Sequence, residues 1–281
     1  MMSLPLAQKA GDAVAALDGA VDAVQGAVRD AVGSSRTVAN ALDGTWLGAP
    51  LHVALTDVPI GALTAAVALD LAGRREADAA LAVGVAGALP AAATGLADWR
   101  YLRGEERRIA TAHALLNVTG LVFHAGSLAA RRADRRGLGR GLLLVGYAIN
   151  GLAAHIGGQL SFGLGVRVNR PALEPKPPAA WTDAGEDDLT PDELRRVEVE
   201  GAPVVVARSG RGLCAIAATC SHLGGPLDEG TREGDSVVCP WHGSRFDLCT
   251  GEVIDGPAVF PQPAYDARVH EGRLEVRGRQ G

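Results

Sequence analysis

Residues 220–245 read CSHLGGPLDEGTREGDSVVCPWHGSR, and this stretch twice places a cysteine close to a histidine. The first pair has the pattern C-x-H at Cys220 and His222, and after sixteen intervening residues the second has C-x-x-H at Cys239 and His242. Two short loops that each supply one thiolate and one imidazole can hold a two-iron cluster, with the cysteines on one iron and the histidines on the other. Two sulfurs and two nitrogens also suit a tetrahedral zinc ion.

The distribution of apolar residues along the chain changes near residue 189. From there to residue 281, apolar residues fall in short runs bounded by glycine, such as APVVVARSG and RLEVRG. Short runs of β-branched residues separated by turn residues are typical of strands. Residues 189–281 therefore predict a small all-β domain that carries the two loops.

The stretch from Leu189 to Gly278 resembles the Rieske iron–sulfur domain family. The resemblance rests on the two Cys/His pairs, on LGGPLDEG after the first pair and on HGSRFDLCTGEVIDGPAVFPQPAY after the second. It implies a [2Fe-2S] cluster and a Gly-Pro loop at Gly256-Pro257 that covers it. The implied cluster ligands are Cys220 and Cys239 on one iron, and His222 and His242 on the other.

Four further positions in these loops distinguish this chain from some members of the resembled family. Gly225 and Trp241 stand where Rieske proteins of quinol-oxidising complexes have a disulfide, so that link is absent. Ser244 matches a serine that hydrogen-bonds toward sulfur, whereas Phe246 replaces a tyrosine that does the same in high-potential members. With one donor of two, we expect a midpoint potential within the roughly −150 to +300 mV Rieske range and away from its top.

The remaining two cysteines, Cys214 and Cys249, also lie in the β region. Four cysteines in a small secreted domain could form two disulfides, but the histidine spacing favours a metal role for the first pair. We interpret Cys214 as a small core residue in an apolar strand and Cys249 as a turn residue.

The N-terminal half contains long runs with almost no charge. Residues 79–97, 109–130 and 141–166 contain no Asp, Glu, Lys or Arg, and residues 44–69 contain only Asp57. Helices of about 20 apolar residues match the thickness of a bilayer core. We predict a four-helix transmembrane domain over residues 47–167, with a soluble alanine-rich bundle as the alternative, followed by a linker rich in proline and acidic residues at 168–188.

Residues 1–46 precede these runs. Apolar residues recur there at helical spacing between positions 7 and 32, which predicts one amphipathic helix and a connector. The helix could pack on the rest of the protein, lie on a membrane surface or pair with a second copy. Residues 48–170 as a whole resemble a bacterial membrane domain family of unknown function, through motifs that include Leu51-His52, Pro59-Ile-Gly61 and Gly95-Leu-Ala-Asp98-Trp99.

Ionisable residues within the apolar runs are the candidates for function in this half. An up-down-up-down arrangement places four of them at one side of the membrane: His52, Asp98, His113 and His155. Histidines from facing helices can hold haem b, so a pair of them is a candidate haem or quinone site. Hydrogen-bonded interfacial histidines and a metal-ion site are the alternatives. His124, eleven residues after His113, is expected on nearly the same helix face.

Charge divides the 281 residues in the same way as hydropathy. The formal net charge is +3 for residues 1–170 and −8 for residues 171–281. Neither half has the basic patches interleaved with aromatic residues that nucleic-acid binding needs, so we expect no nucleic-acid partner. The acidic domain would suit a basic docking partner.

The predicted function is one-electron transfer by a membrane-anchored, ferredoxin-like Rieske protein. Only 39 residues follow His242, too few for the catalytic domain of a self-contained oxygenase. The expected partners are the lipid bilayer and a redox protein: a reductase, an oxygenase or a respiratory component. A membrane redox sensor, whose cluster state alters the helical bundle, is the alternative.

The charges that flank the helices do not indicate on which side of the cell membrane the Rieske domain lies. Seven arginines flank the helices on each side, so the positive-inside rule gives no preference. Arg135-Arg136 resembles a twin-arginine export signal, which would place the domain on the exoplasmic side. Arginine pairs beside helices are more often ordinary topology signals, so the cytoplasmic side is the expectation.

Overall fold

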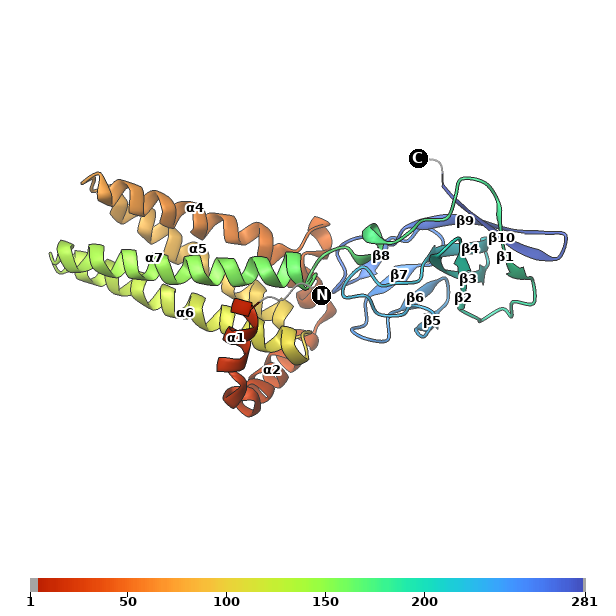
Figure 1. The fold of residues 1–281 in the computed structure, drawn as a ribbon, viewed down its shortest axis with the longest axis horizontal. Helices are drawn as coiled ribbons and strands as arrows, with labels where there is room; N and C mark the ends of the chain where they lie inside the picture. Colours follow the sequence, from red (N-terminus) through yellow and green to blue (C-terminus); the bar gives the residue numbers. More distant parts are fainter. Residues whose placement is uncertain (1–4, 280–281) are drawn as a thin grey trace. The chain divides into compact units, whose positions relative to one another are not determined.

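The computed structural model describes residues 5–279 and divides the chain into two compact units (Figure 1). The helical unit takes in the chain up to Val38 together with Pro50–Val166. The β unit consists of Ala39–Ala49 and the chain from Arg167 onward. A short segment before the first long helix therefore belongs with the C-terminal strands.

Long apolar helices dominate the helical unit. Within residues 5–279, four are long and apolar enough to cross a membrane: α4 (Leu51–Leu71), α5 (Ala77–Trp99), α6 (Gly104–Arg132) and α7 (Arg136–Gly158), the last continued by a π-helical turn at Gln159–Gly163. They form two hairpins, α4 with α5 and α6 with α7 (Figure 1). Their outer faces expose large apolar side chains such as Val58, Leu89 and Val122, as lipid-facing surfaces do.

The interior of this bundle is partly apolar and partly ionic. Leu63, Leu81 and Leu143 form a buried cluster drawn from three of the helices. Near the α4–α5 and α6–α7 turns, the buried Arg131 donates to Asp70 Oδ2 at 2.8 Å and to Asp78 Oδ1 at 2.9 Å. A buried arginine is stable only when paired, so these two acids compensate its charge.

The N-terminal region differs from the single helix predicted over residues 7–32. It forms α1 (Pro5–Ala13), a 3-10 turn at Ala15–Leu17, and α2 (Asp18–Gly33). The expected apolar stripe is interrupted at the turn, where Leu17 is exposed. Helix α2 is held instead by a polar contact, because the buried Gln25 amide donates to the carbonyls of Trp99 and Leu102 at 3.0 Å each.

The β unit begins with the end of α3 (Arg36–Asp43) and a 3-10 turn at Thr45–Leu47. After a second short turn at Arg170–Leu173, the described chain forms ten strands in two antiparallel sheets. In the six-stranded sheet the order is β1 (Thr182–Glu186), β10 (Arg273–Gly278), β9 (Ala264–His270), β4 (Gly212–Ala217), β3 (Ala202–Ser209) and β2 (Arg195–Val199). In the four-stranded sheet it is β5 (Thr231–Glu233), β6 (Ser236–Val238), β7 (Arg245–Asp247) and β8 (Val253–Asp255).

Strand β1 lies within the predicted linker at 168–188. It pairs with β10 from Thr182 opposite Val276 to Glu186 opposite Arg273, with a bulge at Asp183/Gly185. Its sequence, TDAGE, contains almost none of the β-branched or aromatic residues that mark a strand, so pairing to the end of the chain determines its conformation. The linker prediction is wrong for these residues.

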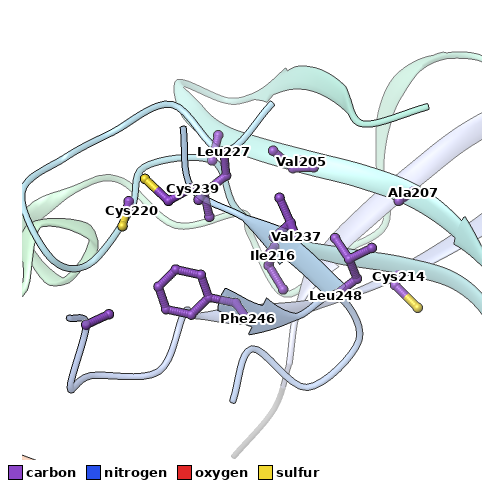
Figure 2. Packing of buried hydrophobic residues seen from close by; sticks show 12 residues of the cluster. Val205, Ala207, Cys214, Ile216, Cys220, Leu227, Val237, Cys239, Phe246 and Leu248 are labelled. Atoms are coloured by element: carbon purple, nitrogen blue, oxygen red, sulfur yellow. The ribbon is translucent and has the colours of Figure 1, made fainter. Parts of the chain in front are cut away.

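The core of the β unit draws on both sheets. Val205 and Ile216 from the larger sheet pack with Val237 and Phe246 from the smaller one (Figure 2). Figure 2 shows Cys220 and Cys239 together at one end of this core and Cys214 at the other. The predicted ligand cysteines are therefore anchored in the packed interior of the domain.

Candidate iron–sulfur centre

The first Cys/His loop is a tight turn that follows β4. The Cys220 amide donates to Gly225 O at 2.8 Å, and the Gly224 amide donates back to Cys220 O at 2.9 Å. Thr219 forms an isolated bridge with Pro226, which closes the loop at its base. These bonds hold the backbone of Cys220 and of His222, which lies between the bonded positions.

The second loop connects β6 to β7 and repeats this pattern. The Cys239 amide donates to Ser244 O at 2.8 Å, and the Gly243 amide donates to Cys239 O at 3.1 Å. Gly243 has a φ of +77°, a conformation that side chains rarely adopt, so the turn after His242 requires glycine. The two loops are thus built alike, each around one cysteine and one histidine.

The loops approach one another most closely at Gly225. A Cβ atom at this position would lie 2.7 Å from Cys239 Sγ and 3.1 Å from Trp241 Cγ. Any side chain here would displace the second ligand sulfur. The cysteine expected at this position in disulfide-linked relatives is therefore sterically excluded by the present geometry.

The predicted ligands come together as two pairs. Cys220 and Cys239 are buried, with their side chains hydrogen-bonded to each other. The rings of His222 and His242 meet edge to face, with centroids 5.2 Å apart. His222 is buried and His242 is partly exposed. This separation into a sulfur pair and a nitrogen pair is what two irons with different ligands require.

Several donors point at the two sulfurs. The backbone amide of His222 and the Ser244 hydroxyl bond to Cys220, and the amides of Trp241 and His242 bond to Cys239. The contact between the sulfurs raises the pKa of Cys220 and lowers the pKa of Cys239 to about 7. The bonds donated by the amides and by the Ser244 hydroxyl act to lower the pKa of the sulfur that accepts them, so these donors favour negative charge on sulfur, as in a cluster that gains an electron.

The arrangement fits a cluster better than the zinc alternative. A mononuclear zinc site needs its four ligands to converge on one point. A [2Fe-2S] cluster instead takes two cysteines on one iron and two histidines on the other, which is how the sulfurs and the imidazoles are grouped here.

The other predicted positions surround these ligands. Ser244 and Phe246 are fully buried, and Trp241 is 52% exposed beside His242. Pro257 is buried in the Gly-Pro loop, and the Ala258 amide donates to Ser244 Oγ at 3.0 Å. The loop thereby orients the serine hydroxyl that bonds to Cys220.

Residues outside the Rieske-like stretch also hold the Gly-Pro loop, which the sequence did not predict. The Gly256 amide donates to Asn40 Oδ1 at 2.9 Å, and Asn40 Nδ2 donates to Asp255 Oδ1 at 3.1 Å. Arg167 donates to Pro257 O and to Asp43 O, both at 2.7 Å. We call Asn40, Asp43 and Arg167 the loop clamp.

Cys214 and Cys249 form a disulfide, which corrects their interpretation as unlinked core and turn residues. Cys214 lies in β4 and Cys249 in the turn after β7, 35 residues further along the chain. The bond joins the larger sheet to the smaller one and lies away from the predicted ligands (Figure 2).

The structure gives different hydrogen-bond partners to the three histidines among the four membrane candidates. His52 Nδ1 bonds to Ala91 O and His113 Nδ1 to Ala153 O, at 2.8 Å each. His155 is exposed on α7, where its Nε2 contacts Gln159 Nε2 at 2.9 Å, and Asp98 is buried on α5. Of the four, His52 and His113 make the same kind of bond, from Nδ1 to a carbonyl oxygen of the helix that follows.

His113 and His124 lie on one hydrogen-bonded chain inside the helical unit. Asn117 Nδ2 contacts His113 Nε2 at 3.1 Å, Asn150 Nδ2 donates to Asn117 Oδ1 at 3.0 Å, and His124 Nε2 contacts Asn150 Oδ1 at 2.7 Å. Neither asparagine is among the residues predicted from sequence, although amides within an apolar run are a signal for them.

Comparison with known proteins agrees with this geometry. Residues 180–266 match the Rieske [2Fe-2S] domain family, and residues 48–170 match the predicted membrane protein family DUF2231. The ferredoxin CarAc of Metapseudomonas resinovorans is 38% identical over 94 residues, covering 33% of this chain and 88% of that protein. The chain belongs to the Rieske iron–sulfur family, and it combines that domain with a DUF2231 domain.

Two further matches are a subunit of a cytochrome complex and a ferredoxin of known structure. A cytochrome b6-f complex iron–sulfur subunit of Chlorobaculum tepidum is 33% identical over 73 residues, 26% of this chain and 39% of that one. Among solved structures, the ferredoxin of carbazole 1,9a-dioxygenase from Nocardioides aromaticivorans is 34% identical with a TM-score of 0.33, covering 35% of this chain and 96% of that chain. Ferredoxins and cytochrome complex subunits are among the Rieske relatives, which supports electron transfer as the activity of the domain.

Proposed function

We propose that this protein is a membrane-anchored one-electron carrier whose [2Fe-2S] cluster is bound by Cys220, His222, Cys239 and His242. The observation that carries the proposal is the pair of like-built loops, which present buried sulfurs and paired imidazoles with amides directed at the sulfurs. When bound, such a cluster accepts and releases single electrons without bond chemistry. The protein supplies the ligands, the donors and a buried site.

The membrane anchor in this proposal is the helical unit. Its long helices are mostly exposed apolar surface, which would be unfavourable in water and is favourable in lipid. Extraction of membranes at high pH tests this part. The chain is expected to remain in the membrane fraction, and its release would contradict the anchoring.

The electron partner is proposed to be a separate redox protein. CarAc is described as a ferredoxin, and the Chlorobaculum relative as a subunit of a cytochrome complex. The net charge of −8 over residues 171–281 favours a partner with a basic docking face, whose association weakens as salt rises.

We further propose that the Rieske domain lies on the exoplasmic side. The support is the Cys214–Cys249 disulfide, because disulfides persist in oxidising compartments and are rare in the cytosol. This proposal replaces the cytoplasmic expectation from sequence. Protease added to spheroplasts of an expressing bacterium should digest the domain, and full protection until lysis would contradict the exoplasmic location.

Electron paramagnetic resonance tests the carrier function itself. The reduced protein should show a histidine-ligated [2Fe-2S] signal, and repeated cycles with an artificial reductant and oxidant should return it undiminished. A protein without the signal, or one that changes state once and cannot be cycled, would not be a carrier.

A further inference from the structure

Arg167 contacts the Gly-Pro loop from outside the Rieske-like stretch of sequence. Its Nη1 donates to Pro257 O at 2.7 Å, and its Nη2 donates to Asp43 O, also at 2.7 Å. The guanidinium is thus held between two backbone carbonyls, one of them in the loop. Arg167 lies between the end of the membrane helices and β1, before the residues that match the Rieske family, so the resemblance to that family assigns it no role.

The backbone of Arg167 adopts a conformation that is rare for arginine. Its φ is +61°, in the left-handed region that favours glycine. A residue with a side chain persists in this region where its surroundings hold it there, and such residues gather at functional sites. Here the surroundings include the two carbonyls that accept from the guanidinium. The fold therefore specifies where this guanidinium lies.

The Pro257 carbonyl that accepts from Arg167 belongs to the same peptide group as the Ala258 amide. That amide donates to Ser244 Oγ at 3.0 Å. Hydrogen bonds in a chain polarise one another, so a cation at the carbonyl oxygen makes the N–H of the same peptide group a stronger donor. The guanidinium therefore strengthens the bond that the loop makes to the serine oxygen.

Ser244 carries this polarisation to a predicted cluster ligand. Its hydroxyl has one proton, and that proton is donated to the Cys220 sulfur. Because the hydroxyl oxygen accepts from the Ala258 amide, the proton becomes more positive and its bond to sulfur stronger. Ser244 is fully buried, so bulk water does not compete for these bonds. A chain of hydrogen bonds thus leads from Arg167 to the sulfur.

We propose that Arg167 is a positioning residue that raises the reduction potential of the cluster through the Pro257–Ala258 peptide group and Ser244. An added electron makes the sulfur ligands more negative, and a chain of donors that begins at a cation stabilises that charge. The proposal rests on the proposed [2Fe-2S] cluster. It adds that a residue of the segment between the helices and the strands sets part of the potential.

Redox titration of the full chain in detergent, followed by electron paramagnetic resonance, tests this role. In Arg167→Gln the equilibrium constant for reduction should fall about tenfold, a drop of about 59 mV for one electron. Arg273→Gln is the matched control, because that arginine pairs with Asp183 instead, and it should keep the wild-type potential. Asn40→Ala removes another contact to the loop but none of the chain of bonds, so it should also keep the potential.

A double-variant cycle separates the chain of bonds from a general effect of charge. Because the proposed effect passes through Ser244, Arg167→Gln should lower the potential much less in a Ser244→Ala background than in the wild type. An equal fall in both backgrounds would overturn the proposal. Arg167→Lys keeps the charge but offers one nitrogen to two carbonyls, so it should give a smaller fall, and it provides the test where Arg167→Gln does not retain its cluster.

The Rieske signal and the iron content of each variant show independently whether the cluster is present. A variant with a full cluster and a lowered potential cannot owe the shift to misfolding. The wild-type potential in a loaded Arg167→Gln or Arg167→Lys protein, or the same fall in Asn40→Ala, would overturn the role of Arg167 and leave the carrier function intact. A wild-type protein without the signal would instead contradict the proposed function, and this proposal with it.

Discussion

Asn40 and Gly256 are joined by a 2.9 Å hydrogen bond from the glycine amide to the asparagine side chain, although 216 residues separate them in sequence. Asn40 precedes the first apolar helix, and Gly256 belongs to the Gly-Pro loop of the Rieske domain. A Cβ on Gly256 would lie 2.6 Å from Thr45 Oγ1, so the N-terminal segment also packs directly on this loop. Asn40 and Thr45, which lie outside the Rieske-like stretch of sequence, therefore contribute contacts to the Rieske domain.

The loop clamp predicts that Asn40→Ala shortens the lifetime of the cluster. The substitution removes the acceptor for Gly256 and the donor for Asp255, which leaves the loop freer to open. A net loss of about 1 kcal/mol corresponds to about fivefold faster release of iron to a chelator at neutral pH. Thr37→Ala, an exposed change in the same helix, is the control. Equal release rates in the two variants would show that Asn40 does not hold the loop.

Ser244 is expected to raise the reduction potential. Its hydroxyl bonds to the Cys220 sulfur, and this bond strengthens as an added electron makes the sulfur more negative. Ser244→Ala should lower the midpoint potential by roughly 40–90 mV, equivalent to about 1–2 kcal/mol for one electron. Ser236→Ala removes another buried serine, which bonds to Glu233 O, and should leave the potential unchanged. An unchanged potential in Ser244→Ala would contradict the role of the hydroxyl.

Gly225 is expected to be essential for cluster assembly. In Gly225→Ala, the new methyl group would occupy space only 2.7 Å from Cys239 Sγ, so either the sulfur or the loop must move. We expect most of the iron to be lost, measured as iron and acid-labile sulfide per chain. Gly210→Ala introduces the same methyl group at a position with no atom within 4 Å and should retain the cluster. A full cluster in Gly225→Ala would show that the two loops can move apart far enough to accommodate the methyl group, which would contradict this prediction.

The disulfide predicts a stability difference between oxidised and reduced protein. Cys214→Ala should lower the free energy of unfolding by about 2–4 kcal/mol, because the bond closes a loop of 35 residues in the unfolded chain. Thermal unfolding followed by circular dichroism measures the change, and peptide mass spectrometry of the wild type tests the pairing directly. Identical melting of the wild type with and without reductant would mean that the bond does not form.

Local sequence patterns predicted the two Cys/His loops and the long helices, because both depend mainly on residues that are close together in the chain. Both Cys/His loops are short turns, so their spacing alone indicated a metal centre. The apolar runs likewise predicted the long helices, although the structure extends α6 to Gly104–Arg132 because its charged first and last turns carry no hydropathy signal. A resemblance to the Rieske family then narrowed the metal centre to a [2Fe-2S] cluster.

Contacts between distant segments were not predictable in this way. Nothing near Asn40 indicates that it bonds to Gly256, and nothing near Cys214 indicates its bond to Cys249. Strand β1 was missed because its polar sequence is a strand only through pairing with β10. Each of these features depends on where the rest of the chain folds, which composition and periodicity do not specify.

The ligand set of the iron–sulfur cluster is tested most directly by pulsed electron paramagnetic resonance of the reduced protein. The proposed ligands Cys220, His222, Cys239 and His242 predict a [2Fe-2S] signal with hyperfine couplings from two imidazole nitrogens. Replacing His242 by cysteine should remove one of the two couplings. A signal without nitrogen couplings, or a protein that holds zinc and gives no signal on reduction, would contradict the account.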